Sequence, residues 1–530
     1  MSRHLFLLSI LAAIVLATTA ACGNDDDGEA VGATGDTLVI ALTSEPENLS
    51  PIFMDFYAGN WRTFNGLLSY DADLNLVPDL AAEMPDVSED GETVTVRLRE
   101  DVTFHDGEPL TSDDVVFTYE SLLDPDVGTE LRARFDLAEV IEGVEAIDEH
   151  TVEFHLSRPD AAFFHKLYPG IVPQHLLEGE DLNTADFNRN PVGTGPFVFD
   201  EWSSGERIVM TANEDYHHGD VGIPRVVFTF IEDENARVSQ LRDGTVDATA
   251  VPPRLAGDFR DDDNFQVVEV PSADARVAVL PHDEPNLEDP QVRRALAMGI
   301  NREAIVDGVL AGSGEPAYGP YIAGAMPPEI PHDPDAAREL IEEAGWSTGS
   351  DGFYERDGER LGFELLYPSG DSVRRDIALA IRSDLQELGV DVEVDGAGWD
   401  VITDRFGSGD AGNMFAWGQP YDPDLELYLH FHSAFLDDGE PFNNPARIDD
   451  PAIDDALDTG RRSLDPDERL AAYSDLQEAL QEDASWLFGV YMQPTIVMAS
   501  NISDVEVQPE GHFHGVSRGV MWAMEDWQID

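Results

Sequence analysis

Strand-like and helix-like patterns of apolar residues alternate along the whole chain. Residues 37–42 and 226–231 are nearly continuous apolar runs, as expected for strands that are covered on both faces. Residues 93–98 and 151–156 alternate apolar and polar side chains, which is typical of strands with one buried face. Because such strands are interspersed with helical patterns throughout, the sequence predicts an α/β protein.

Helix boundaries are marked by local capping signals. Asp289 and Asp333 are each followed directly by proline, the order expected for an N-cap and the first helical residue. Gly345 is placed to end the second of these helices. A longer helix with one apolar face is predicted to end at Gly389, and residues 390–394 then alternate as a strand.

The first residues have the features of an export signal. Residues 5–16 form a nearly continuous apolar run after a weakly basic start, and residues 19–21 are small enough for a signal peptidase. The apolar run is shorter than the about 20 residues that span a bilayer comfortably. We therefore expect residues 1–21 to be a signal peptide and the mature protein to be exported.

Cys22 is the only cysteine, so it cannot form an internal disulfide. Residues 16–22 resemble a lipoprotein signal, in which the cysteine becomes the lipidated first residue; the alternative is an ordinary signal peptide with a chance cysteine. Residues 22–35 are polar and acidic, which predicts a solvated tether. The expected location is the cell surface or periplasm, with a lipid anchor on Cys22.

The charge balance is strongly acidic. The chain has 31 Lys and Arg residues against 107 Asp and Glu residues, a formal net charge of −76, and Lys166 is its only lysine. Such a surface repels nucleic acid and anionic membranes, so neither is an expected partner. The acidic residues are spread along the chain, which favours a solvated surface adapted to high salt, as in halophilic proteomes, over a set of cation sites.

Four groups of motifs, in this order along the chain, carry a family resemblance. They are LVPDLA at 76–81 with FHDGEPLTSDDV at 104–115; PVGTGPF at 191–197 with NEDY at 213–216 and LRDGTVD at 241–247; VRRALAMGINRE at 292–303 with AGW at 344–346; and WGQPYDPD at 417–424. Together they resemble the family-five class of extracellular solute-binding proteins, which take peptides, nickel or oligosaccharides. The resemblance covers the chain from about residue 36 to about residue 500.

This resemblance implies an α/β, two-lobed periplasmic-binding-protein-like fold (type II, cluster C) with an extra inserted domain. The chain would enter each lobe discontinuously. The implied ranges are 36–68, 192–273 and 490–530 for lobe I, 69–191 for the inserted domain, and 274–489 for lobe II. The hinge crossings would lie near residues 273 and 489, and a ligand bound between the lobes would favour their closure.

The resemblance also implies the substrate-binding subunit of an ABC importer. Such a subunit captures peptides or similar small solutes and delivers them to separate permease and ATPase chains. Peptide is the leading ligand because it is the commonest in the family, with oligosaccharide and metal chelate as alternatives. A relative that only senses its ligand has the same sequence features. No cofactor is expected, and the protein is expected to be a monomer.

The loop at 417–424 is the expected ligand-binding element, because in this family it faces the cleft between the lobes. Trp417 is expected to be a stacking platform, with Tyr421 as an aromatic wall beside it; the alternative for Trp417 is a core tryptophan. In peptide-binding members an aspartate three residues after the tryptophan pairs with the peptide's amino group. Here that position is Pro420, so Asp422 or Asp424 is expected to replace it.

A second binding segment is expected after the first strand, where family ligands are approached from the other lobe. This segment is FMDFY at 53–57, and it supplies Met54, Phe56 and Tyr57 as candidate ligand contacts.

Enzyme signatures are missing from the sequence. It contains no H-E-x-x-H and no G-x-S-x-G pattern, and the mature fold has no cysteine nucleophile. The glycines at 193–195 fit a tight turn, because the lysine and hydroxyl residue of a phosphate-binding loop do not follow. His105 and Asp106 fit a turn better than a catalytic pair. We therefore expect no enzymatic activity, with a secreted hydrolase as the alternative from a different class.

Three histidine pairs could contribute metal ligands. The two His-Phe-His runs, at 430–432 and 512–514, would place both imidazoles on one face if they lay in strands. His217 and His218 are the weaker pair, because neighbours on a strand point to opposite faces. Scaffold roles are favoured for all three pairs, and no metal site is assigned.

Overall fold

The structure is a computed structural model that describes residues 36–53, 62–436, 439–512 and 518–529. The export signal, the acidic tether and part of the segment after the first strand lie outside these ranges. The candidate residues among them are Cys22, Met54, Phe56 and Tyr57, whose roles stay predictions.

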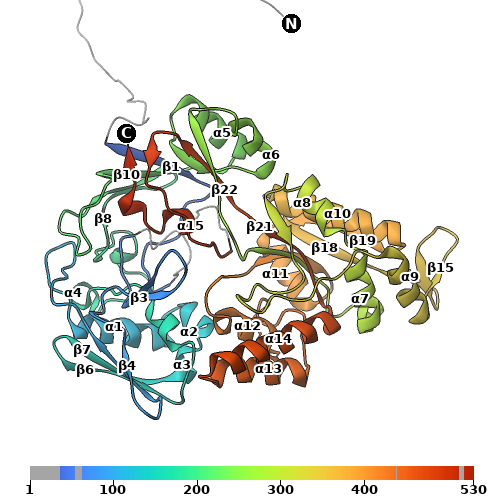
Figure 1. Cartoon of the computed structure of the whole chain (residues 1–530), viewed down its shortest axis with the longest axis horizontal. Helices are drawn as coiled ribbons and strands as arrows, with labels where there is room; N and C mark the ends of the chain where they lie inside the picture. Colours follow the sequence, from blue (N-terminus) through green and yellow to red (C-terminus); the bar gives the residue numbers. More distant parts are fainter. Residues whose placement is uncertain (1–35, 54–61, 437–438, 513–517, 530) are drawn as a thin grey trace, which may run out of the picture. The chain divides into compact units, whose positions relative to one another are not determined.

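The first large sheet combines strands from distant parts of the chain (Figure 1). Within the described residues its order is β12-β22-β11-β1-β10-β9-β8. The bounds are β1 Thr37–Leu42, β8 Phe197–Ser203, β9 Arg207–Ala212, β10 Arg225–Phe230, β11 Ala248–Ala250, β12 Phe265–Glu269 and β22 Thr495–Ala499. Strand β1 is parallel to both of its neighbours, and its last five residues are buried, as its apolar run predicts.

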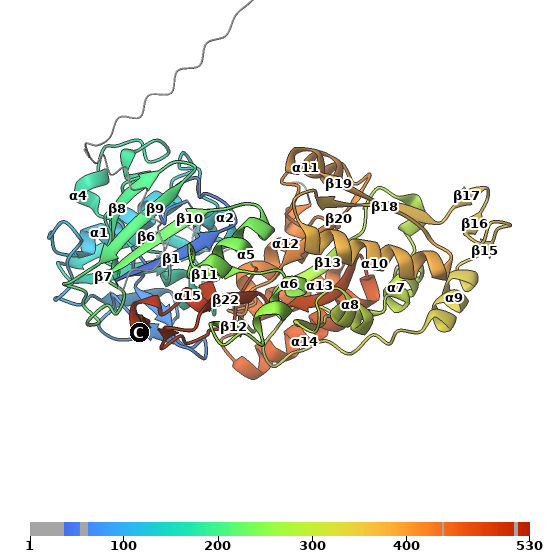
Figure 2. The same cartoon turned by 90° about the horizontal axis from the view of Figure 1, so that it is seen from above.

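A second sheet has the order β14-β21-β13-β20-β18-β19 in the described part of the chain. Its strands are β13 Ala275–Val279, β14 Gly314–Pro316, β18 Gly362–Pro368, β19 Asp391–Ala397, β20 Gly412–Trp417 and β21 Trp486–Met492. Helix α10 (Ser372–Leu388) contacts β18 and β19 and runs beside them in both views (Figures 1 and 2). Its buried face packs into the apolar core on that side of the sheet.

A third sheet is formed by the part of the chain between β1 and β8, two strands of the first sheet. Its order is β4-β5-β7-β6 among the described residues, with β4 Asp86–Val87, β5 Thr93–Arg97, β6 Ile141–Asp148 and β7 Thr151–Leu156. Helix α1 (Ser112–Leu123) contacts β6 and β7, and their apolar side chains share one core. This sheet lies within residues 69–191, the inserted segment, which the family resemblance predicts to be an inserted domain; that this segment is a separate domain stays a prediction.

Short sheets and helices complete the described chain. The small sheets contain β2 Leu68–Tyr70 with β3 Leu76–Pro78, β15 Ser347–Thr348 with β16 Tyr354–Arg356 and β17 Glu359–Arg360, and β23 Ile502–Ser503 with β24 Gln528–Ile529. The other helices are α2 Leu131–Arg134, α3 Leu137–Val140, α4 Gln174–Leu177, α5 Glu234–Asp243, α6 Pro253–Ala256, α7 Pro290–Gly299, α8 Arg302–Gly308, α9 Pro334–Glu343, α11 Trp399–Ser408, α12 Asp424–Phe431, α13 Pro451–Arg462, α14 Pro466–Asp483 and α15 Arg518–Met521. Within the described ranges, every helix is too short or too polar to cross a membrane.

The predicted helix ends are confirmed. Asp289 accepts a hydrogen bond from the backbone N–H of Gln291 at 2.9 Å, and Asp333 caps α9 in the same manner. Gly389 ends α10 with φ +105°, a conformation that disfavours residues with a Cβ atom. These features depend on neighbouring residues only, which is why the sequence locates them.

The chain passes between the two large sheets in two places. It leaves the first sheet after β12 and enters the second at β13, and it returns between β21 and β22. Strand β21 continues to Met492, so the return lies at Gln493 and Pro494, a few residues beyond the expected position near 489. Whether the sheets belong to lobes that move separately stays a prediction.

Gly418 packs tightly against the first of these crossings. It has φ +131°, and a Cβ atom there would lie 2.1 Å from the carbonyl oxygen of Ala273. A larger residue would therefore push the loop after Trp417 away from the crossing. Glycine is therefore required after Trp417 for a structural reason that does not depend on ligand contact.

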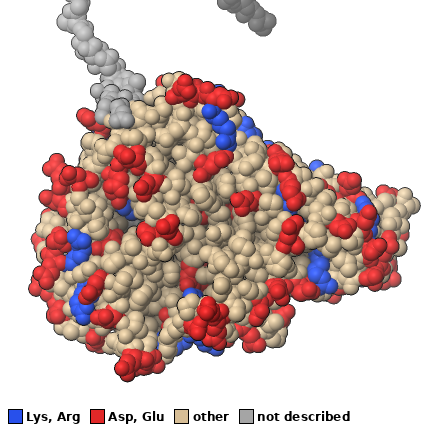
Figure 3. Space-filling model, in the orientation of Figure 1, with Lys and Arg blue, Asp and Glu red and all other residues tan. Residues whose placement is uncertain are grey.

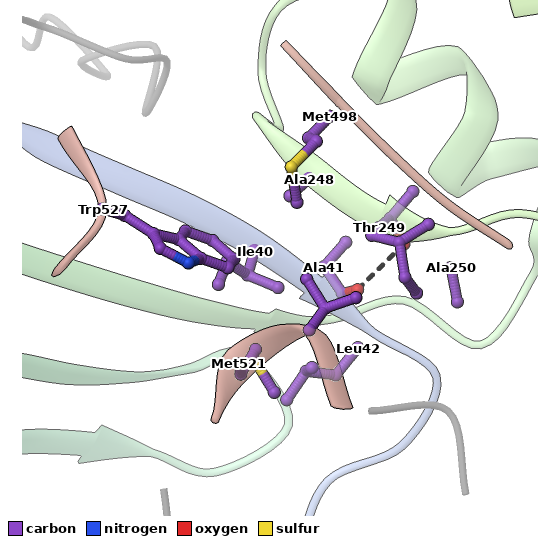
Figure 4. Close-up of a pocket in the computed structure, with 11 residues that line it drawn as sticks. Ile40, Ala41, Leu42, Ala248, Thr249, Ala250, Met498, Met521 and Trp527 are labelled. Carbon is purple, nitrogen blue, oxygen red and sulfur yellow. Dashed lines mark hydrogen bonds between the residues drawn. The ribbon is translucent and has the colours of Figure 1, made fainter. Parts of the chain in front are cut away.

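The first large sheet also contains a small apolar void. It has a volume of about 20 Å³ and lies between the ends of β1 and β11 and the side chains of Met521 and Trp527 (Figure 4). The Thr249 hydroxyl beside this void donates a hydrogen bond to the backbone carbonyl of Ala41 on the neighbouring strand. The void is large enough for about one water molecule, so it is too small for a solute.

Candidate ligand-binding site

A cavity of about 580 Å³ is lined by residues from three separated parts of the chain. Glu130 and Arg134 come from the inserted segment, and Glu510, His512 and Arg518 come from the C-terminal segment. Thr129 and Gly511 belong to the same two segments, and the third part of the chain, around the second sheet and its helices, supplies Arg374, Trp399, residues 415–419, Tyr421, Glu426, Leu429, His430, Glu440, Phe442 and Asn443. The volume lies in the range of small-molecule pockets.

Trp417 lines this cavity and also belongs to the core. Its side chain is only 6% exposed, and its ring packs 5.1 Å from the ring of His430 and 5.7 Å from that of Trp486. Much of each ring face is therefore covered by protein. Among the described residues, however, nothing accepts a hydrogen bond from the buried Trp417 Nε1.

Tyr421 lines the same cavity from the other end of the loop. Its ring centroid lies 4.4 Å from that of Tyr70, and the Arg518 guanidinium carbon lies 5.3 Å from the Tyr421 ring centroid. Arg518 also stacks over Tyr168, at 4.2 Å. These contacts hold an arginine against an aromatic wall, an arrangement favoured by cation–π attraction.

Asp422 and Asp424 occupy a different environment. Neither residue lines the cavity. Asp422 accepts two hydrogen bonds from Arg469, at 2.9 and 2.8 Å, and Asp424 accepts one from Arg461 Nε at 2.7 Å. The expectation that one of them replaces the family's amine-binding aspartate does not fit this arrangement, because both carboxylates are already paired with arginines.

These aspartates belong to an ionic network that joins the loop to the inserted segment. Arg461 also donates to Asp136 at 2.9 Å, and Lys166 donates to Asp160 at 2.7 Å nearby. The Lys166 side chain, the only lysine amine of the chain, is 1% exposed. Burial raises the pKa of Asp424, with Arg461 and Lys166 acting in the opposite direction.

Glu426 is the acidic residue of α12 that lines the cavity. Its carboxylate lies 3.7 Å from Arg134 Nη2, and its Oε2 atom is buried with no hydrogen-bond partner among the described residues. Burial raises the pKa of Glu426 to about 7, although Arg134 opposes this shift. Its protonation state therefore changes near neutral pH.

His430 follows Glu426 by one helical turn. Its Nδ1 lies 2.8 Å from the Glu426 carbonyl oxygen, which can only accept, so Nδ1 carries the proton. Burial lowers the pKa of His430 to about 4, outweighing this hydrogen bond. A neutral imidazole with an unprotonated Nε2 is the result.

Arg374 and His512 also line the cavity and contact each other. His512 Nδ1 donates to Asp274 Oδ1 at 2.8 Å, and Arg374 Nη2 lies 3.4 Å from His512 Nε2. Burial lowers the pKa of His512, although the fully buried Asp274 raises it. Asp274 directly precedes β13, so this chain of contacts connects the cavity to a crossing between the sheets.

The strand argument for the histidine pairs is wrong for the run at 430–432. His430 lies in the last turn of α12 and His432 follows the helix, so the two imidazoles do not share a strand face. His432 stacks on Tyr428 instead. In the other run, residue 514 lies outside the described residues.

Sequence reasoning missed most of the charged lining. Arg134, Arg374, Glu426 and Arg518 lie in no motif quoted for the family, and the chain separates the first from the last by several hundred residues. For the three arginines, the only hint in the sequence is that basic residues are scarce in this chain, so that three of them in one cavity are unusual. Finding them requires the packing of the sheets.

Sequence comparison provides the deciding observation. The model of the bacterial extracellular solute-binding proteins, family 5, middle region, matches residues 75–437. The chain belongs to this family. It is a two-lobed solute-binding protein with mixed α/β content rather than an enzyme, as its motifs predict.

Three relatives illustrate the range of the family. Protein XP55 of Streptomyces lividans is 40% identical over 97% of this chain and 95% of its own length. Oligopeptide-binding protein AppA of Bacillus subtilis is 27% identical over 97% and 98%, and its structure with a nonapeptide gives a TM-score of 0.78. NikZ of Campylobacter jejuni, solved with Ni(L-His), is 31% identical over 94% of this chain and all of that chain, with a TM-score of 0.85.

Proposed function

We propose that this chain is the substrate-binding subunit of an ABC importer and that it captures peptides or amino-acid-derived solutes in the 580 Å³ cavity. The observation that carries the proposal is a set of unpaired polar atoms. Trp417 Nε1, both polar atoms of the Gln419 amide, and Glu426 Oε2 are buried without hydrogen-bond partners among the described residues. Buried polar groups are normally paired, so a polar ligand is the expected partner.

The charges of the lining support a zwitterionic ligand. Three arginines, Arg134, Arg374 and Arg518, line the cavity together with four glutamates. Charge-assisted hydrogen bonds from such groups are stronger than those between neutral groups, and they recognise carboxylate and ammonium ends. A neutral oligosaccharide has no charged end to offer these arginines and glutamates. This favours peptide over oligosaccharide.

An amino-acid chelate of a metal is the second candidate. His430 and His512 both line the cavity as neutral imidazoles, which are good ligands for nickel and similar ions. The likeness to a protein solved with Ni(L-His) adds to this candidate. In both cases the ligand carries a carboxylate that an arginine can bind.

The deciding experiment identifies the ligand and its contacts together. Native mass spectrometry of gently purified protein identifies the solute that co-purifies, and calorimetry then compares defined peptides, Ni(L-His) and oligosaccharides. Arg374→Gln is expected to weaken binding of the carboxylate-bearing ligand by about tenfold or more, since a charge-assisted bond contributes about 1.5–3 kcal/mol. The matched control is Arg338→Gln, a partly exposed arginine on α9 that does not line the cavity.

Two outcomes contradict the proposal. Binding of neutral oligosaccharide without binding of peptide or chelate would exclude the ligand class. Peptide binding that is equally tight in wild type, Arg374→Gln and Glu426→Gln would place the ligand elsewhere.

The mature protein is further proposed to be a monomer anchored to the membrane by a lipid on Cys22, delivering its ligand to separate permease and ATPase subunits. The apolar run, the small residues and the single cysteine support the anchor. Two or three acyl chains anchor stably, whereas a single chain holds weakly.

A further inference from the structure

A second group of ligand-binding side chains is made of Asp79, His217 and His218. One donor atom of each lies within 4.8 Å of the others. None of the three lines the 580 Å³ cavity. Among the described residues, this is the only group of three or more His, Cys, Asp or Glu side chains with such spacing.

We propose that Asp79, His217 and His218 bind a divalent transition-metal ion of the Zn²⁺ type, at a site separate from the ligand cavity. Two imidazoles and one carboxylate suit zinc and its neighbours in the first transition row. Hard ions such as Mg²⁺ and Ca²⁺ prefer all-oxygen sites, so the histidines select against them.

The spacing of the donor atoms fits such an ion. His218 Nε2 lies 2.8 Å from Asp79 Oδ1, and His217 Nε2 lies 3.4 Å from the same oxygen. Tetrahedral zinc with bonds of about 2.0–2.1 Å separates its ligand atoms by about 3.3 Å. To admit the ion, His218 Nε2 and Asp79 Oδ1 would have to separate from 2.8 Å by about half an ångström.

The two histidines converge because they lie in a turn. They follow β9 and precede Gly219, which has φ +126°, and neither residue belongs to a strand. From the sequence alone this pair is the weakest candidate for metal ligands, because neighbours on a strand point to opposite faces. That rule does not apply to a turn. Their ring centroids lie 4.3 Å apart.

Asp79 is held in place by a polar neighbour. Asn65 Nδ2 donates to both of its carboxylate oxygens, at 3.1 and 2.9 Å. Support of this kind from outside the ligand set is usual at metal sites, because it fixes the ligand geometry.

A cavity of about 270 Å³ adjoins the group and gives an ion access from solvent. Asp79 and His218 are part of its lining, together with Asp220 and Asp526. The single arginine in this lining, Arg62, is paired with Glu525 through its Nε, at 3.0 Å, and through Nη2. Arg99, which donates to the His217 carbonyl, is paired with Asp101. The mouth is therefore not net cationic.

The location gives the ion a structural consequence. Asp79 follows β3, where the inserted segment begins, and the histidines belong to the first large sheet's connection between β9 and β10. An ion bound to all three would join these segments, which are more than 130 residues apart in the sequence. Because such an ion binds the folded state, it raises stability.

The test uses full-length, tag-free protein that has been stripped with a chelator. Zn²⁺ is titrated by calorimetry in molar NaCl with a large excess of Mg²⁺, so that surface carboxylates are occupied or screened. Co²⁺ is titrated in parallel, because its visible absorption reports tetrahedral nitrogen and oxygen ligands. We expect one Zn²⁺ per chain and a rise in melting temperature.

His218→Ala is the principal variant, because its side chain is 39% exposed and its loss leaves no core cavity. It is expected to weaken Zn²⁺ binding at least tenfold and to remove the Co²⁺ absorption band. His217→Gln is the second variant. His150→Ala is the matched control, since His150 belongs to no group of three donors among the described residues.

Three results would overturn the proposal. The first is that Zn²⁺ does not bind above the Mg²⁺ background, and the second is that His218→Ala and wild type bind Zn²⁺ with equal affinity. The third is that His512→Gln, rather than His218→Ala, loses Zn²⁺ binding, which would place the ion in the ligand cavity. The first two would mean that the histidines only hydrogen-bond Asp79. Peptide binding in His218→Ala is measured separately, so failure of this site is distinguishable from failure of the proposed transport function.

Discussion

Arg469 holds Asp422 by two hydrogen bonds, from Nη1 to Oδ2 at 2.9 Å and from Nη2 to Oδ1 at 2.8 Å. The Asp422 side chain is 5% exposed and does not line the cavity, although it belongs to the same loop as Trp417 and Tyr421, which do. The carboxylate that the sequence suggests for the ligand instead fixes the position of the loop.

Asp422→Asn is therefore expected to act on stability. Removing one partner of a buried pair leaves the other charge uncompensated, at a cost of about 3–5 kcal/mol. Denaturant unfolding measures this loss, and Asp422→Asn with Arg469→Gln is expected to cost less than the sum of the two single changes. Asp335→Asn, in an exposed pair with Arg338, is the control and is expected to leave stability unchanged.

Glu426 is expected to make stability depend on pH. Its pKa of about 7 in the folded protein exceeds the unfolded value near 4.5, so the folded state binds more protons between these pH values. Stability therefore falls as the pH rises from about 4.5 to about 7, and the ionised carboxylate costs about 3 kcal/mol above that window. Glu426→Gln removes this cost.

The measurement is the free energy of unfolding of Glu426→Gln and wild type at several pH values. The variant is expected to be more stable at about pH 8 and to lose this advantage at about pH 4. Glu478→Gln, an exposed change on α14, controls for the loss of one negative charge. A constant difference between Glu426→Gln and wild type across the range would contradict the prediction.

Salt is expected to stabilise the fold. Asp and Glu are distributed over the face seen in Figure 3, where Lys and Arg are few, in keeping with the net charge of −76. In about 1 M salt the Debye length falls to about 3 Å, which weakens repulsion between exposed carboxylates. The melting temperature should rise with NaCl at neutral pH and rise less at about pH 4, where many carboxylates are protonated. A melting temperature that does not change with salt would contradict adaptation to high salt.

Ligand is expected to compact the protein. A solute that contacts residues from all three segments of the cavity favours the closed arrangement by its difference in affinity for the two states. Small-angle scattering should show a smaller radius of gyration at saturating ligand, and Arg374→Gln should require more ligand for the same change. An unchanged scattering profile of the saturated wild type would count against closure.

Cys22→Ser is expected to release the protein from the membrane. Mass spectrometry of the wild type should find a diacylglyceryl-modified Cys22 as the first residue, and cell fractionation should move the variant to the soluble fraction. Ser44→Ala, a change beyond the tether, is the control. A mature N-terminus elsewhere, with an unmodified Cys22, would exclude the anchor.

Local features of the fold are predictable from the sequence. Asp289 and Asp333 cap their helices, and Gly389 ends α10, because these interactions involve residues only a few positions apart. The family motifs extend this knowledge to the two-lobed architecture. The pattern is less informative where local geometry depends on context, as at His430, where the condition of a shared strand face is not met because the residue lies in a helix.

The candidate site is less predictable because distant segments make it. Trp417 and Tyr421 line the cavity, and their contact with a ligand stays a proposal. Asp422 and Asp424 do not line it, because they pair with Arg469 and Arg461, which lie on helices whose packing the sequence does not reveal. The cavity's arginines come from segments that meet only in the folded chain. Met54, Phe56 and Tyr57 lie outside the described residues, so their role stays a prediction.

The burial of Lys166 has a practical consequence for labelling. Reagents that acylate amines find no accessible ε-amino group among the described residues of the native protein, because the one lysine is enclosed beside Asp160. Once the chain unfolds, that amine becomes reactive. The rate at which a fluorescent ester attaches at this position therefore reports local opening around Lys166, a single, naturally unique residue, with no engineered probe.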